Sequence, residues 1–102
     1  MSNDIPIVCT LNDAEFRERE RVVLEKLKSA MRETAETVDG YTFSFTSDDE
    51  LLRDLSEFII LERRCCPFLD FSLKVGRGGG DIVLELSGPD GAKEFIASTF
   101  AP

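Results

Sequence analysis

The 102-residue sequence contains no histidine, no tryptophan, one tyrosine and three cysteines. Without histidine, the chain cannot form the Ser-His or Cys-His pairs of nucleophilic enzymes, or a metal centre with imidazole ligands. Basic side chains are also few. The sequence has twelve basic and twenty acidic side chains, which gives a formal net charge of −8. Since nucleic-acid binding depends on clustered Lys and Arg, we expect no nucleic acid as a partner.

Long apolar runs are absent as well. No stretch of the sequence approaches the roughly 20 apolar residues of a membrane span, and the start MSNDIPIVCT has neither the basic nor the apolar region of a secretion signal. Three cysteines cannot all pair within one chain, which argues against a secreted disulfide framework. We therefore expect a cytoplasmic protein with no membrane contact, since the cytoplasm keeps thiols reduced.

The sequence does contain enough apolar material for a folded core. Hydrophobic residues make up 42% of the chain, and eight of them are phenylalanine. Disordered chains instead combine low hydrophobicity with high charge. The length is close to the usual size of a compact domain, which is about 100–150 residues. We expect residues 1–102 to form a single domain.

The first third of the sequence predicts a long helix. Asn12 and Glu15 have the spacing of a helix-capping box. Apolar side chains then recur at helical intervals as far as Met31, and the charged segment RERER between them is typical of a solvated face. This helix is expected to end before the turn signal Asp39-Gly40.

The middle of the sequence predicts a strand and a second helix. Apolar and polar residues alternate from Tyr41 to Thr46, which is the period of a half-buried strand. Ser47 followed by Glu50 forms a second capping box. We therefore expect a helix over residues 48–65.

The last third predicts a hairpin and a third helix. Alternation over residues 69–75 and 82–86 predicts two strands joined by the glycine-rich segment 76–80. No helix with a Lys-Ser/Thr pair follows these glycines, so they do not form a phosphate-binding loop. Gly88-Pro89 opens the last predicted helix, with Pro89 near its first position. The order α-β-α-β-β-α predicts an α+β fold of two layers, with a three-stranded antiparallel sheet and helices on one face.

The end of the second predicted helix is the most informative part of the sequence. On a helical wheel Glu62 falls within the apolar stripe, with Cys66 in the same arc and Cys65 at its edge. Pro67 ends the helix, because proline disfavours helical geometry in the residue before it. A buried carboxylate must be paired, hydrogen-bonded or protonated. Such a break in the apolar pattern is typical of a functional site.

Adjacent cysteines favour a metal site over a disulfide between them. Consecutive Cα atoms lie about 3.8 Å apart, whereas disulfide-bonded residues usually have theirs about 5.5–6 Å apart. Two neighbouring thiolates can instead bind one soft metal ion. Cys9 or Glu62 could complete a trigonal site for an ion such as Hg(II) or As(III). Arg63 and Arg64 are expected to lower the thiol pKa values, although the C-terminus of a helix disfavours anions.

Two other interpretations of the cysteines stay open. They could be packed in the core of a structural or interaction module, because free cysteine is among the most frequently buried residues. Alternatively, Cys65 or Cys66 is the nucleophile of a thiol-dependent enzyme and Glu62 is its proton acceptor. Glu62 could also form a structural ion pair with an arginine. The candidate arginines are Arg17, Arg21 and Arg53.

The segment ERRCCPFLDF, from Glu62 to Phe71, resembles the Glu-Arg-x-Cys-Cys-Pro-Phe signature of a family of small bacterial proteins. The segments from Pro6 to Leu11 and from Leu86 to Gly91 are also similar to that family, so the resemblance covers most of the chain. The family is associated with heavy-metal resistance, mercury in particular, and has no established activity. The resemblance implies a functional set of four residues: Cys9, Glu62, Cys65 and Cys66.

Taken together, these features predict a cytoplasmic α+β protein that binds a thiophilic metal ion. Cys65 and Cys66 are the expected ligands, and Cys9 or Glu62 completes the site. A soft metal ion is the only cofactor expected. A homodimer is a candidate assembly, because the long charged first helix could extend to a second copy.

Overall fold

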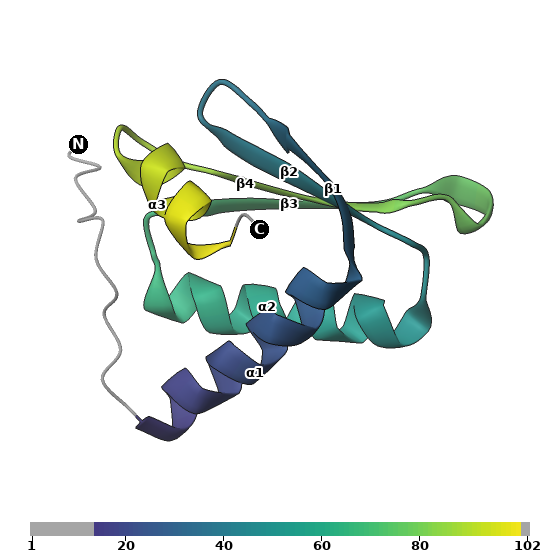
Figure 1. The fold of residues 1–102 in the computed structure, drawn as a ribbon, viewed down its shortest axis with the longest axis horizontal. Helices are drawn as coiled ribbons and strands as arrows, with labels where there is room; N and C mark the ends of the chain where they lie inside the picture. Colours follow the sequence, from purple (N-terminus) through teal and green to yellow (C-terminus); the bar gives the residue numbers. More distant parts are fainter. Residues whose placement is uncertain (1–13, 101–102) are drawn as a thin grey trace.

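The computed structural model describes residues 14–100, which form three helices and a four-stranded antiparallel sheet. The elements follow one another as α1 (Ala14–Ala30), β1 (Met31–Glu36), β2 (Gly40–Phe45), α2 (Asp49–Cys65), β3 (Asp70–Val75), β4 (Ile82–Ser87) and α3 (Ala92–Thr99). The sheet order is β1-β2-β4-β3. Figure 1 shows α1 and α2 on the same side of the sheet, and α3 near the end of α2. The predicted α+β class is confirmed.

The strand count was wrong, because the sequence predicted a helix where β1 lies. Of the six residues in β1, only Met31 is even half-buried, so the segment has no apolar alternation. Its backbone is instead ordered by antiparallel pairing with β2. A tight hairpin joins the two strands, and in it the Thr37 N–H donates to the Gly40 carbonyl. The observed order is therefore α-β-β-α-β-β-α, with four strands in place of the three predicted.

Two predicted helix starts also needed correction. The N-cap of α2 is Asp48, whose carboxylate accepts a hydrogen bond of 2.9 Å from the Leu51 N–H, so the predicted cap at Ser47 is displaced by one residue. Helix α3 begins only at Ala92, after Gly91 with a φ of 94°. Pro89 lies in the preceding turn, where its carbonyl accepts from the Ala92 N–H. The predicted cap at Asn12 lies outside the described residues.

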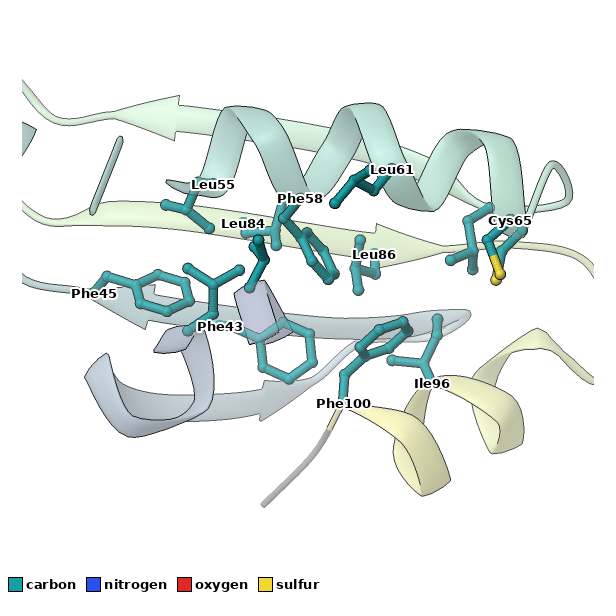
Figure 2. Packing of buried hydrophobic residues seen from close by; sticks show 14 of the residues in the cluster. Phe43, Phe45, Leu55, Phe58, Leu61, Cys65, Leu84, Leu86, Ile96 and Phe100 are labelled. Carbon is teal, nitrogen blue, oxygen red and sulfur yellow. The ribbon is translucent and has the colours of Figure 1, made fainter. Parts of the chain in front are cut away.

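The core lies between the inner face of the sheet and the helices. Phe43 of β2 lies opposite Leu84 of β4, and each is at most 2% exposed. Figure 2 shows Leu55 and Phe58 of α2 directed at the same cluster, which Phe100 closes from the C-terminal side. The predicted alternation is confirmed along all of β4, where buried and half-buried residues alternate. In β2 it is confirmed from Phe43 to Phe45, whereas Tyr41 is only half-buried.

Helix α1 packs on α2 through apolar side chains and surface ion pairs. Val23 and Leu27 of α1 are each 2% exposed and belong to the core cluster. At the surface, the Arg19 guanidinium contacts the Glu57 carboxylate of α2 at 2.5 Å. Exposed ion pairs contribute little free energy, so the apolar contacts hold the two helices together. This packing brings the first turns of α1 beside the end of α2.

Gly40 is a position where no other side chain fits. It pairs with Ser87 of β4, and a Cβ atom placed on it would lie 1.8 Å from the Leu86 carbonyl oxygen. We expect Gly40→Ala to lower the free energy of unfolding by about 1–3 kcal/mol, because the backbone of β4 must move. Urea denaturation would measure this. A loss no larger than that of Ala35→Ser, an exposed change on β1, would contradict the close approach.

Candidate functional site

The last turn of α2 buries a carboxyl group. Glu62 is only 2% exposed, and among residues 14–100 it is the single charged residue in the core. Its position follows from the helical spacing that also buries Phe58 and Cys65 on the same side of α2. No helix in this part of the chain is both long and apolar enough to cross a membrane.

Cys66 contacts this carboxyl group directly. The Cys66 Sγ donates a hydrogen bond of 3.6 Å to Glu62 Oε1, and the Cys66 N–H donates to the Glu62 carbonyl at 2.6 Å. Cys66 is the C-cap of α2, with φ −125° and ψ 73°, so the backbone leaves the helix at this residue. Pro67 follows and prevents a further helical turn. The end of the helix thus places the thiol over the carboxyl group one turn earlier.

Glu62 is a neutral acid at pH 7. Its pKa is raised to about 9, mainly by burial and then by the nearby Glu20 side chain of α1, while the hydrogen bond from Cys66 acts in the opposite direction. Glu62 Oε2 has no hydrogen-bond partner within residues 14–100. Two ionised carboxylates offer no donor to each other, whereas a protonated Glu62 has an O–H that can donate to Glu20. Protonation therefore relieves both the burial and the repulsion.

Cys66 is a protonated thiol for the same reasons. Its pKa is raised to about 12, mainly by burial and then by the neighbouring Glu62 carboxyl group. The predicted lowering of this pKa by Arg63 and Arg64 is wrong, because both side chains are exposed and neither contributes to the shift. A thiolate is the reactive form of cysteine, so Cys66 is not an activated nucleophile in this state.

Cys65 and Cys66 are in different chemical states. Cys65 is 4% exposed and disulfide-bonded, whereas Cys66 carries a free, buried thiol. Figure 2 places Cys65 at the end of α2, at the border of the core cluster. Cys9, the third cysteine of the predicted set, lies outside the described residues.

An open cleft of about 320 Å³ gives access to this group of side chains. Helices α1, α2 and α3 each contribute to its wall. The lining residues are Arg17, Glu20, Arg21, Leu24, Glu62, Cys65, Cys66, Phe95 and Thr99. Glu20 was not among the predicted site residues, because it lies in the charged segment that was assigned to a solvated face. The signal was present, because Glu20 lies midway between Phe16 and Leu24 at the helical spacing of the apolar stripe.

The predicted ion pair of Glu62 is not found among the described residues. Arg21 contacts the carboxylates of Glu18 and Glu25 on its own helix. No salt bridge within residues 14–100 includes Glu62. The contact that Glu62 does form is with the Cys66 thiol.

The described residues do not by themselves form a preassembled metal centre. Within residues 14–100, no three His, Cys, Asp or Glu side chains are grouped closely enough to hold an ion. Comparison of the chain with protein-family models, curated proteins and solved structures finds no match. The features of this region that bear on function are the thiols, the acid and the cleft.

The buried state of Cys66 predicts very slow alkylation. The pKa of a thiol sets the fraction that is ionised at a given pH. At pH 8 the thiolate fraction of a thiol with a pKa of about 12 is about a thousandfold smaller than that of an ordinary cysteine. We expect iodoacetamide to modify Cys66 about a thousandfold more slowly in the native protein than in urea at the same pH. Peptide mass spectrometry would measure the rate at Cys66 alone. Similar rates in both conditions would show that the thiol is accessible and ionised.

Proposed function

We propose that the reduced protein binds a thiophilic metal ion through Cys65 and Cys66, with Glu62 or Cys9 as a further ligand. One observation carries this proposal: the free Cys66 thiol contacts the buried Glu62 carboxyl on the wall of an open cleft that Cys65 also lines. The two sulfur-bearing residues thus face the same accessible space. Soft ions such as Hg(II) and Cu(I) prefer sulfur ligands in such a setting.

Charge balance supports a divalent ion. Bound thiolates replace the thiol protons, so a divalent ion with two thiolates forms a neutral complex. A neutral complex suits a site where the residues are at most 4% exposed, because burial penalises uncompensated charge. While Glu62 keeps its proton it adds no charge, and it becomes a ligand only when that proton is lost. Because Cys66 must lose its proton, the affinity is expected to rise with pH.

The disulfide at Cys65 supports a dependence of metal binding on the redox state of the protein. A sulfur in a disulfide cannot serve as a thiolate ligand, so the ion binds only after reduction. The cytoplasm, which we propose as the location, keeps protein thiols reduced. The same ion added to the oxidised protein would meet only the Cys66 thiol in this cleft.

The test is a titration of the reduced protein with Hg(II), followed by the thiolate-to-metal charge-transfer absorption. We expect one tight, stoichiometric site. The double variant Cys65→Ser, Cys66→Ser is expected to lose it, while Cys9→Ser reports whether Cys9 is a ligand. Tight binding that persists in the double variant would refute the proposal and favour a module with inert, packed cysteines.

The disulfide favours one alternative, a thiol–disulfide redox protein. Cys65 is oxidised while the adjacent Cys66 is free, which is the pairing of a disulfide and a thiol that exchange requires. The raised pKa of Cys66 disfavours its attack as a thiolate. A reduction potential below about −300 mV is typical of a structural disulfide, and thioredoxin-like potentials near −270 mV or higher are typical of catalytic ones. Equilibration with a dithiol buffer, with peptide mapping of Cys65, would separate these cases.

A further inference from the structure

Within residues 14–100, strand β3 is an unprotected edge of the sheet. It pairs with β4 on one side, and among the described residues no strand lies on the other. Its six residues, DFSLKV, include no proline and pair with β4 in an unbroken register. The opposite edge, β1, has a register irregularity between Met31 and Glu33 and almost only exposed side chains. Edges are commonly blocked by such irregularities and charges, so β3 is the edge that remains open to pairing.

The two faces of β3 differ in character. On the inner face, Phe71 and Leu73 are only half-buried although they lie next to the core. On the outer face, Asp70, Ser72 and Lys74 are exposed. Beside the inner face, a shallow groove of about 570 Å³ runs between β3 and the end of α2, with Ile59 and Phe71 among its lining residues. The edge thus offers uncovered apolar surface on one face and charges on the other.

The hydrogen-bond pattern shows which backbone groups of β3 are free. Gly76 and Asp81 form the next residue pair after Val75 and Ile82 in the β3–β4 register. The Gly76 N–H donates to the Asp81 carbonyl, so Gly76–Asp81 is a hydrogen-bonded pair of the ladder. Hydrogen-bonded and non-hydrogen-bonded pairs alternate along an antiparallel ladder. Ser72 and Lys74 therefore direct their backbone groups to β4, and Phe71 and Leu73 direct theirs to the open edge.

We propose that two copies of the chain pair through β3, antiparallel, about a two-fold axis at Ser72. Phe71 then lies opposite Leu73 of the second copy, so the free backbone groups of both residues form hydrogen bonds. Their side chains cover each other on the inner face, beside the groove. Asp70 lies opposite Lys74 of the second copy on the outer face. Because the axis repeats each contact, the interface gains two complementary charge pairs.

Charge complementarity selects this register. Within residues 14–100, neither Asp70 nor Lys74 takes part in an ion pair. Moving the axis to Leu73 places Lys74 opposite Ser72 and loses both charge pairs. A shift by one residue places outer-face side chains opposite inner-face ones, which a continuous pleated sheet does not allow. The Ser72-centred register is the one that satisfies the backbone, the apolar face and the charges together.

Charge reversal tests the proposal. Sedimentation velocity over a concentration series is expected to show a monomer–dimer equilibrium for the wild-type chain. Lys74→Glu and Asp70→Lys should each raise the dissociation constant about tenfold, because both symmetric pairs become repulsive. An equimolar mixture of the two variants should restore dimers, since their charges are complementary. Lys28→Glu and Glu33→Lys, the same changes at exposed positions elsewhere, should leave the wild-type constant unchanged.

A cysteine at the axis tests the register independently. Ser72→Cys is expected to form a disulfide-linked dimer on mild oxidation, because the two Ser72 residues face each other as a non-hydrogen-bonded pair. Ser98→Cys, at an exposed position on α3, serves as the matched control and should not cross-link. A monomeric wild-type chain, which would mean that another segment or protein covers β3, would overturn the proposal. Dimers unaffected by both charge reversals would overturn it as well.

Discussion

The Glu62→Gln variant is expected to be more stable than the wild-type protein at neutral pH. In the folded protein Glu62 keeps its proton up to a pKa of about 9, whereas the ordinary value is 4.5. Between these values the folded state binds one more proton than the unfolded state. The free energy of unfolding therefore falls as pH rises through this window, by about 1.4 kcal/mol per pH unit. Glutamine is neutral at every pH, so the variant avoids this loss, on the order of 3 kcal/mol at pH 7.

Urea denaturation of both proteins from pH 5 to pH 9 would measure the difference. The chain has no histidine, so no side chain with an ordinary pKa obscures the lower part of this window. Glu57→Gln is the matched control on the same helix, because the Arg19 ion pair lowers the pKa of Glu57 and its titration falls below the window. A slope of unfolding free energy against pH that is the same in Glu62→Gln as in the wild type would contradict the raised pKa of Glu62.

If wild-type Glu62 does lower the stability of the protein, that cost would itself indicate a functional role, since such costs are characteristic of functional sites.

Truncation of Phe58 is expected to cause the largest loss of stability. Phe58 is 2% exposed and contacts Phe100 edge-on, with ring centroids 5.5 Å apart and planes at 86°. It therefore joins α2 to α3 across the inner face of the sheet (Figure 2). Phe58→Ala removes this contact and leaves a cavity, and such changes usually cost about 3–5 kcal/mol. Domains are stable by only about 5–15 kcal/mol.

The matched control is Ile60→Ala on the same helix. Ile60 is 51% exposed, so its truncation should cost well under 1 kcal/mol by the general behaviour of surface changes. Urea midpoints of the two variants and the wild type, measured at one pH, would give both values. Equal losses for Phe58→Ala and Ile60→Ala would contradict the described position of α2 on the core.

The sequence could predict those elements whose residues carry a burial pattern. Helix α2 and strands β2 and β4 were found because their apolar residues alternate with the period of one buried face. Strand β1 has no buried face, and its order comes from pairing with β2 across a hairpin. No local pattern encodes such pairing, so the exposed residues after Met31 were assigned to the helix before them.

The candidate site shows the same division. The wheel predicted that Glu62 and Cys66 lie on the buried side of α2, and both are at most 2% exposed. The shift in the pKa of Cys66 was predicted in the wrong direction. The neighbouring arginines in the sequence suggested a lowered pKa, whereas burial by other elements of the fold raises it. The spacing of Glu20 places it on the apolar stripe of α1, but its approach to Glu62 depends on how α1 packs on α2. The sequence thus predicts the side on which a residue lies, and the packing decides its protonation.

The proposed metal site is tested most directly by X-ray absorption at the metal edge of the reduced protein loaded with one equivalent of Hg(II). At least two sulfur neighbours are expected in the first coordination shell. One sulfur fewer is expected in Cys66→Ser, because Cys66 lines the cleft beside Glu62. A shell of oxygen and nitrogen alone, or a sulfur count that does not change in Cys66→Ser, would contradict the proposed site.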